Sequence, residues 1–215
     1  MLTLGIHTAG AACDIAILRD QEVLASRTEA MMRGQDARLP ILVAEACEDA
    51  AVNLHDFDRY GVVTGPGSFT GVRVGVSFAR GLALATGKPC LGITSLEAAL
   101  PKGQQGSALV ALPAQRRAPD ITYWTQTFRT GCATGDAKEL RLEALADLLL
   151  AHPHMVYGSA DALIEHVSGL EVRPAEPTAL RAAELTAIFE PERHKPSPTY
   201  VRAPDAALPG GKRLE

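Results

Sequence analysis

The sequence has little excess charge, few aromatic residues and no long apolar run. Its net charge is −4, and aromatic residues make up 5% of the chain, with a single tryptophan. Proteins that hold nucleic acid through a general basic field carry an excess of Lys and Arg, so this sequence predicts no such field. No stretch approaches the ~18 consecutive apolar residues of a membrane-spanning helix, so we expect no membrane association.

Metal-binding and disulfide patterns are also missing. The four cysteines, Cys13, Cys47, Cys90 and Cys132, form no C-x-x-C pair, and the six histidines form no H-E-x-x-H motif. This spacing indicates neither a disulfide framework nor a zinc site. Scattered single cysteines are typical of a reducing compartment, and we expect a cytoplasmic protein with no metal site of its own.

Hydrophobic periodicity predicts alternating strands and helices. Leu2, Leu4 and Ile6 alternate with smaller or polar residues, which is typical of a half-buried strand. Apolar residues spaced three and four apart predict two long helices in the first half of the chain. The expected strands are 2–7, 13–18, 22–28, 60–64, 90–93, 107–112, 121–128 and 154–158, and the expected helices are 36–53, 70–86, 141–151, 160–167 and 178–189, with a short one opening at Thr94.

A polar, glycine-containing segment at 102–106 indicates a boundary between two lobes. We expect a regular first lobe at 1–102 and a less regular second lobe at 103–215, with a loosely ordered tail from about Ala203. Three consecutive strands followed by strand–helix units indicate an α/β fold, with a mixed sheet flanked by helices. Two such halves in tandem suggest a duplicated lobe.

The least ordinary segment is Gly65-Pro66-Gly67-Ser68-Phe69-Thr70-Gly71-Val72-Arg73-Val74-Gly75, which joins a predicted strand to a predicted helix. Backbone N–H groups at such a junction can hold an anion. The segment lacks the lysine of a G-x-x-x-x-G-K-[ST] phosphate loop, and it does not match the G-x-S-x-G nucleophile elbow. Ser68 or Thr70 is therefore expected to serve as the N-cap of the helix.

One face of this second helix carries small side chains, at Gly71, Gly75, Ala79 and Ala83. Glycine inside a helix costs up to ~1 kcal/mol relative to alanine, so the stripe needs a compensating contact. Close packing against another helix would supply it. The partner is either the helix at 36–53 or another subunit, and the apolar rows around most of the helix favour another subunit.

The signature segment resembles that of the bacterial TsaB (YeaZ) family, and the similarity extends over the first hundred residues with shorter pieces beyond. The matching residues are 65–75, Ala79, 81–83, 6–9, 39–40, 92–96, 123–124 and 198–202. The resemblance implies an ASKHA (actin/Hsp70/sugar-kinase-like) fold made of two RNase H-like lobes.

The resemblance also implies a role in tRNA modification, the addition of a threonylcarbamoyl group to the adenosine beside the anticodon. In that family this subunit is not the catalyst. It pairs with the metal-bearing transferase TsaD, an ATPase subunit TsaE joins them, and homodimers form when TsaD is absent. ATP, threonylcarbamoyl-adenylate and the metal are then expected on the partner subunits, with no cofactor and no catalytic residue on this chain, and tRNA is the substrate of the complex.

The helices at 36–53 and 70–86 are the pairing surface that the resemblance implies. The interface residues are then Leu39, Leu42, Ala46, Gly71, Arg73, Gly75, Ala79 and Ala83, beside a signature loop of Gly65, Pro66, Gly67, Ser68, Phe69 and Thr70. On this basis Gly75→Leu is expected to abolish pairing while the monomer stays folded.

Three departures from the family pattern favour a scaffold over an ATPase. His7 stands where relatives have an aspartate, Gly34 stands where they have a histidine, and Pro113-Ala114-Gln115 replaces an Asp-Ala-Arg sequence. Imidazole suits Mg²⁺ poorly, because hard cations prefer oxygen ligands.

Two other functions stay open on the same fold. A glycoprotease-like (M22) peptidase would need clustered metal ligands, which the sequence motifs do not provide. A small ASKHA kinase would need the aspartate that His7 replaces and a glycine-rich adenosine loop. The candidate for that loop is 131–135, which has the composition of a turn.

Overall fold

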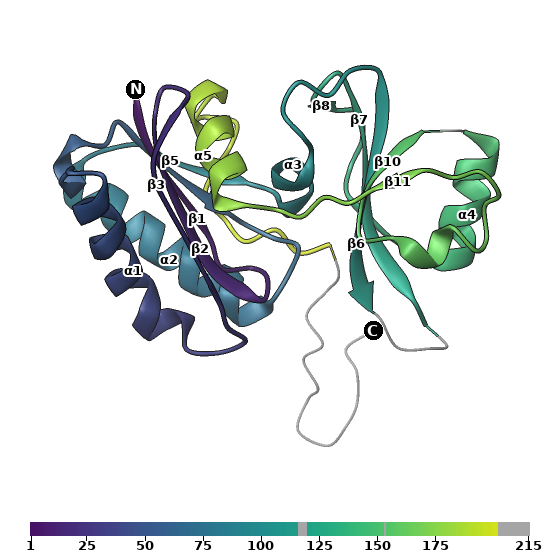
Figure 1. The fold of residues 1–215 in the computed structure, drawn as a ribbon, viewed down its shortest axis with the longest axis horizontal. Coiled ribbons are helices and arrows are strands. Elements are labelled where there is room, and N and C mark those ends of the chain that lie inside the picture. The colour runs from purple at the N-terminus through teal and green to yellow at the C-terminus, as the bar shows by residue number, and fades with distance from the viewer. Residues whose placement is uncertain (116–119, 153, 202–215) are drawn as a thin grey trace.

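The computed structural model describes residues 1–115, 120–152 and 154–201, and it places them in two lobes that each contain a mixed β-sheet (Figure 1). The first sheet has the strand order β3-β2-β1-β4-β5. The first three strands are antiparallel neighbours, and β4 and β5 run parallel to β1. The bounds are β1 (Leu2–His7), β2 (Ala12–Arg19), β3 (Glu22–Ala30), β4 (Arg59–Val63) and β5 (Cys90–Ile93).

The second sheet has the order β11-β10-β6-β7-β8, and β9 also pairs with β7. The helix α4 (Leu142–Ala151) packs its apolar side chains on this sheet. The two lobes therefore share one plan, a mixed sheet flanked by helices, which confirms the predicted fold class. The strands are β6 (Ser107–Gln115), β7 (Thr122–Arg129), β8 (Cys132–Ala133), β9 (Lys138–Arg141), β10 (Met155–Gly158) and β11 (Val172–Arg173).

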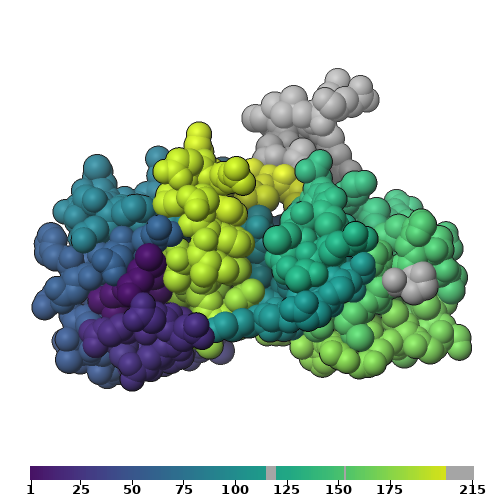
Figure 2. Space-filling model, turned by 90° about the horizontal axis from the view of Figure 1, so that it is seen from above, coloured from purple at the N-terminus to yellow at the C-terminus, as the bar shows by residue number. Residues whose placement is uncertain are grey.

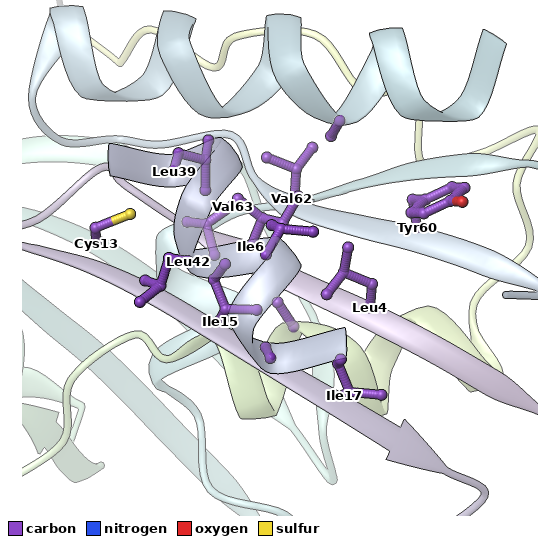
Figure 3. Close-up of a cluster of buried hydrophobic side chains, with 14 of the residues drawn as sticks. Leu4, Ile6, Cys13, Ile15, Ile17, Leu39, Leu42, Tyr60, Val62 and Val63 are labelled. Atoms are coloured by element: carbon purple, nitrogen blue, oxygen red, sulfur yellow. The ribbon is translucent and has the colours of Figure 1, made fainter. Parts of the chain in front are cut away.

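One face of the first sheet is covered by α1 (Gln35–Asp49) and α2 (Phe69–Thr86) (Figure 1). Leu39 and Leu42 of α1 project among sheet side chains such as Ile6 and Ile15, and all four are fully buried (Figure 3). The apolar spacing of three and four in α1 therefore serves the core of its own lobe.

The opposite face of the same sheet is covered by α5 (Ala179–Ile188), which comes from near the far end of the chain. Two glycines let the helix approach, because a Cβ at Gly5 would overlap the Ala179 carbonyl oxygen and a Cβ at Gly61 would overlap Thr186 Oγ1. Asp14 Oδ2 accepts a hydrogen bond from Ala179 N at 2.7 Å, which places a carboxylate at the positive end of the helix dipole.

This helix corrects two predictions. The sequence predicts a half-buried β1, but all six residues of the strand are buried because helices cover both faces. The sequence also assigns 103–215 to the second lobe, whereas Ala182 and Leu185 of α5 belong to the first lobe's core. The chain thus returns to the first lobe after building the second sheet, and α5 lies on that lobe in the space-filling view (Figure 2).

Some element ends also differ from expectation. The helix predicted at 36–53 stops at Asp49, because Ala51 takes a left-handed conformation (φ 50°) and Val52 N donates to Cys47 O at 3.0 Å; a 3₁₀ turn, Leu54–Asp56, follows. The predicted helix at 160–167 is wrong. The segment forms a 3₁₀ turn at Asp161–Leu163, although its buried apolar residues, Ala160, Leu163 and Val167, have the spacing of a helix face.

The sequence also predicts a capping box at Thr94, a turn at 131–135 and a loose tail from about Ala203. The short helix α3 (Ser95–Ala99) begins with the expected capping box, in which Thr94 N donates to Glu97 Oε2 at 2.8 Å and Glu97 N donates to Thr94 Oγ1 at 3.1 Å. The segment at 131–135 includes the turn between β7 and β8. The tail predicted from about Ala203 lies outside the described residues. No helix within the described ranges combines the length and apolarity that a membrane crossing needs.

Candidate functional site

The signature loop connects β4 to α2 and packs on the turn between β1 and β2. Ser68 is the N-cap of α2, since its Oγ accepts a hydrogen bond from Gly71 N at 3.2 Å, and Thr70 is exposed on the first turn. Ser68 N donates to Ala9 O at 2.7 Å, and a Cβ at Gly67 would overlap the same oxygen. The loop is therefore a close backbone junction, and its glycine permits the approach.

The small-residue stripe of α2 faces the first sheet. A Cβ at Gly71 would overlap the Thr8 carbonyl oxygen, and a Cβ at Gly75 would overlap Thr8 Oγ1 and lie 3.4 Å from a methyl group of Val62. Thr8 Oγ1 donates to Gly71 O at 2.7 Å, and Ala79 is fully buried. The sequence left α1 and another subunit as partners for the stripe, but the structure shows a third partner, the sheet of the same lobe.

The predicted interface residues consequently divide into two groups. Three side chains of α1, Leu39, Leu42 and Ala46, are fully buried in the core of the lobe, as are the stripe residues of α2 that contact the sheet. A side chain that its own core buries cannot contact a partner. Arg73 is exposed and Ala83 is partly buried, so these two alone of the predicted set reach the surface.

The outward side of α1 and α2 carries apolar surface that the predicted set missed. A groove of about 590 Å³ lies along the second half of α1, the turn that follows it and one flank of α2. Its lining residues are Pro40, Val43, Ala44, Cys47, Glu48, Ala51, Val52, Asn53, Leu54, Phe78 and Leu82. Large apolar side chains are also exposed on or beside these helices: Met32 is 78% exposed, Ile41 53% and Leu84 87%. Single exposed apolar residues are ordinary, so the groove, and not these three side chains, is the candidate docking surface. Of the apolar rows that the sequence shows on α2, Phe78 and Leu82 line this groove, whereas Val72 and Val76 are buried in the core of the lobe.

An aromatic and cationic cluster lies where α2 begins. The Arg73 guanidinium stacks over the Phe69 ring at 3.7 Å from its centroid, and the Phe69 and Tyr200 rings are 5.4 Å apart. Arg73 Nε donates to Tyr200 Oη at 3.2 Å, and Thr199 N donates to Thr64 O at 2.8 Å. The segment around Tyr200 is thereby held against the signature loop, although more than a hundred residues separate them.

A second cavity, of about 550 Å³, lies between the two lobes and is lined by the signature loop together with His7, Asp14, Ser95 and Trp124. Burial lowers the pKa of His7 to about 4, and the nearby Asp14 carboxylate opposes part of this shift. His7 is therefore neutral at pH 7. Asp14 is held at both oxygens, by Thr28 Oγ1 at 2.7 Å and by Ala179 N.

Metal ligands are not gathered at either cavity. In the residues that the structure describes, no group of three or more His, Cys, Asp or Glu side chains is arranged to hold a metal ion. The four cysteines carry free thiols. Burial raises the pKa of Cys90 to about 12 and that of Cys13 to about 11, which keeps both thiols protonated at neutral pH.

The two mixed sheets and the cavity between them define the class of protein, a two-lobed α/β protein of the ASKHA fold. Two solved structures share this fold. YeaZ from Pseudomonas aeruginosa superposes with a TM-score of 0.71 at 23% identity, over 93% of this chain and 99% of that one. The ROK hexokinase from Thermus thermophilus superposes with a TM-score of 0.53 at 16% identity, over 87% of this chain and 98% of that one.

Sequence comparison defines the family. A family model described as TsaD: tRNA N6-adenosine threonylcarbamoyltransferase matches residues 22–169. An uncharacterised protein of Mycobacterium tuberculosis is 34% identical over 209 residues, covering 94% of this chain and 92% of that protein. The tRNA threonylcarbamoyladenosine biosynthesis protein TsaB of Escherichia coli is 36% identical over 96 residues, covering 45% of this chain and 41% of that protein. The chain belongs to the TsaB (YeaZ) family.

Proposed function

We propose that this chain takes part in the synthesis of threonylcarbamoyladenosine in tRNA, as a non-catalytic subunit that binds and activates a TsaD transferase. The name of the Escherichia coli relative supports the pathway, and the match to the transferase family supports a link to that enzyme. The observation that carries the pairing is the apolar groove between α1 and α2.

The groove has the chemistry of a helix-docking surface. Its walls are mostly apolar, with Ala44 exposed on α1 and Phe78 and Leu82 partly buried on α2, and Glu48 and Asn53 add polar groups. A helix that lays apolar side chains between α1 and α2 would remove this surface from water, at roughly 25 cal/mol per Å² of apolar area. Since the transferase family model matches this chain, we expect the transferase to offer a similar pair of helices, so that two helix pairs pack face to face.

The same groove would serve a homodimer when the transferase is absent. A twofold pairing uses one surface patch on both copies, and an apolar patch on a single element pair can meet its own copy as well as a related protein. Heterodimer and homodimer are then competing states, and the transferase should convert the second into the first.

The proposal leaves the chemistry on the partner subunits. ATP, threonylcarbamoyl-adenylate and the metal would be held by TsaD and by the ATPase TsaE, with tRNA as the substrate of the whole complex in the cytoplasm. The cavity between the lobes supports this division. Its described lining contains no Lys or Arg to bind phosphates, and its two carboxylates, Asp14 and Glu176, belong to no group of three or more metal ligands in the described residues.

Reconstitution with the transferase from the same organism tests the proposal. We expect the purified chain and TsaD to elute together as a 1:1 complex, and we expect threonylcarbamoylation of tRNA to require both proteins together with TsaE and a supply of the adenylate. The chain alone should show no transfer. Separate elution of the two proteins, or undiminished transfer by TsaD and TsaE without this chain, would contradict it.

A further inference from the structure

Two segments of the chain carry positive charge and no negative charge. Residues 59–96 contain Arg59, Arg73, Arg80 and Lys88 but no Asp or Glu, although the whole chain has a net charge of −4. The strap, which we define as residues 193–201, contains Arg193 and Lys195 and again no acidic residue. The acidic residues that give the chain its negative charge are therefore confined to other segments.

The fold brings these two segments together at one edge of the first sheet. The strand β5 is the outermost strand of that sheet. Gly92 N of β5 donates to His194 O at 2.8 Å, and a Cβ at Gly92 would overlap the Lys195 carbonyl oxygen. Further along, Thr199 N donates to Thr64 O at 2.8 Å. The strap therefore passes beside the end of β5 toward the signature loop and the start of α2.

The cations of α2 lie on the side of the helix that faces away from the α1–α2 groove. Arg80 is two residues from Phe78 and from Leu82, which line the groove, and at about 100° per residue this places Arg80 on the opposite flank. Arg73 is seven residues earlier and shares that flank. Burial raises the pKa of Cys90 to about 12 and the Arg80 charge opposes part of this rise, which agrees with a position beside β5. We define the basic strip as Arg73, Arg80, Lys88, Arg193 and Lys195.

The charges of the basic strip are not neutralised by the chain itself. Elsewhere, cations have carboxylate partners: Arg38 pairs with Glu45 at 2.8 Å, and Arg181 pairs with Glu184 at 2.9 Å. No cation of the strip forms an ion pair with a carboxylate in the described residues. Four of the five side chains are exposed, and Lys88 is partly buried. A row of uncompensated cations on an acidic protein favours a polyanionic partner.

An aromatic pair at one end of the strip indicates which polyanion. Phe69 is 42% exposed and Tyr200 is 44% exposed, and Arg73 contacts both rings. Unpaired nucleic-acid bases stack on exposed aromatic rings and on guanidinium planes, while their phosphates pair with Lys and Arg. A flat anionic membrane fits less well, because it would also meet the exposed carboxylates of Glu190 and Glu192 beside the strap.

We propose that the basic strip, together with Phe69 and Tyr200, binds single-stranded RNA, with phosphates at the cations and bases stacked on the rings. The inference rests on the proposed function for the source of that RNA, which is an unpaired region of the tRNA substrate. The strip and the α1–α2 groove lie on opposite flanks of α2, so RNA and the transferase can bind at the same time.

Two double variants with the same change in net charge test the position of the site. Arg80→Gln with Lys195→Gln removes two cations of the strip, and Arg19→Gln with Lys138→Gln removes two exposed cations on β2 and β9. The probe is a fluorescently labelled tRNA from the same organism that reads a codon beginning with A, and anisotropy measures its binding to the full chain. We expect at least tenfold weaker binding for the strip variant and a change within twofold for the control.

Two results would overturn the proposal. Equal weakening by the two double variants would show that only the total charge matters. No saturable binding of tRNA to the wild-type chain up to about 100 μM, the weak end of non-specific nucleic-acid binding, would show that the strip holds no RNA.

The salt dependence reports whether the cations contact phosphates. Each phosphate contact with a single strand contributes about 0.7 to the slope of log affinity against log salt concentration. The strip variant should therefore have a slope smaller by about 1.4 than the wild type, and the control variant should keep the wild-type slope. Equal slopes in all three proteins would contradict phosphate binding at Arg80 and Lys195.

Tyr200→Leu separates base stacking from charge. It should weaken binding of a single-stranded RNA at least fivefold and leave binding of inorganic polyphosphate within twofold, because polyphosphate has no bases to stack. Equal losses with both probes would contradict the stacking. Vesicles of phosphatidylglycerol and phosphatidylcholine in equal amounts should not bind, and tighter binding to them than to tRNA would overturn the proposal in favour of a membrane.

Pairing with the transferase is measured on the same variants to keep the two proposals apart. The strip variant should elute with TsaD as the wild type does, because its substitutions lie away from the groove. A wild-type chain that pairs with TsaD but binds no tRNA would contradict the RNA site alone. Strip-dependent tRNA binding by a chain that never pairs with TsaD would contradict the proposed function and support the RNA site.

Discussion

The two sides of the α1–α2 pair differ in the size of the side chains they present. The inward side of α2 is built from Gly71, Gly75 and Ala79, and it lies so close to Thr8 that a methyl group has no room at either glycine. The flank of α2 beside α1 carries Phe78 and Leu82, which line the groove, and the outward side presents Leu84 to solvent. Small residues therefore mark where the chain meets itself, and large exposed apolar residues mark where it can meet another protein.

The largest expected effect comes from filling the inward side. Gly75→Leu would overlap Thr8 Oγ1 and crowd Val62, and it would break the buried hydrogen bond from Thr8 Oγ1 to Gly71 O. Overpacking costs roughly 1–3 kcal/mol and the lost bond a similar amount, so we expect destabilisation by about 3 kcal/mol or more. Chemical denaturation measures it. This replaces the prediction from the sequence that the variant leaves the monomer folded.

Measuring both the stability and the transferase affinity of Gly75→Leu tests whether the small-residue stripe faces inward. A Gly75→Leu protein with wild-type stability and no affinity for the transferase would show that the stripe faces a partner after all. A destabilised protein that still binds, in proportion to its folded fraction, supports the inward assignment.

His7, at the end of β1, belongs to the buried region of the first lobe, and its pKa reports how well that region excludes water. Its pKa is about 4 in the folded protein against 6.5 as the ordinary value. Below pH 6.5 His7 binds a proton in the unfolded chain, whereas in the folded chain it stays unprotonated until near pH 4. The free energy of unfolding therefore falls as the pH decreases through this window. From pH 7 to pH 5 we expect His7 to account for a loss of about 2 kcal/mol.

His7→Gln isolates this contribution, because every other titrating group is present in both proteins. The difference in unfolding free energy between pH 7 and pH 5 should be about 2 kcal/mol smaller in the variant than in the wild type. Parallel pH profiles for the two proteins would show that His7 is protonated as readily in the folded chain as in the unfolded one.

The smallest expected effect uses a matched pair of glycines in one helix. Gly81 is exposed, and a Cβ there would meet no atom within 4 Å, whereas a Cβ at Gly75 would overlap Thr8 Oγ1. Gly81→Ala should stabilise the protein by up to about 1 kcal/mol through helix propensity, and Gly75→Ala should destabilise it. Thermal unfolding of the two variants measures the signs, and equal signs would contradict the difference between the two sides.

The sequence predicts the regular elements of the first lobe well, because hydrophobic periodicity is a local signal. The strands and both long helices follow from this periodicity. The hydrogen bonds of the predicted capping box at Thr94 are also present. The position of α5 has no local signal. Its contacts at Gly5 and Gly61 join residues more than a hundred positions apart, and a glycine in a strand does not say which helix approaches it.

Local periodicity also fails to predict which partner the candidate site contacts. Periodicity identifies Gly71, Gly75 and Ala79 as one face of α2, but it cannot say whether that face meets a sheet, a helix or another subunit. The other apolar rows of α2 have different surroundings: Phe78 and Leu82 line the groove with α1, Val72 and Val76 are buried in the core, and Leu84 is exposed. Short strands such as β8 and β11, of two residues each, carry no periodicity at all and depend on their neighbours in the sheet.

The affinity of two matched variants for the transferase tests most directly whether the outward groove is the pairing surface. Ala44 and Ala37 are both exposed on α1, but Ala44 lines the groove and Ala37 does not. Arginine is a good helix former, so both substitutions should keep the fold. We predict that Ala44→Arg raises the dissociation constant of the complex at least tenfold at an unchanged melting temperature, while Ala37→Arg leaves it within twofold. Equal affinities for the two variants would contradict the assignment of the groove as the pairing surface.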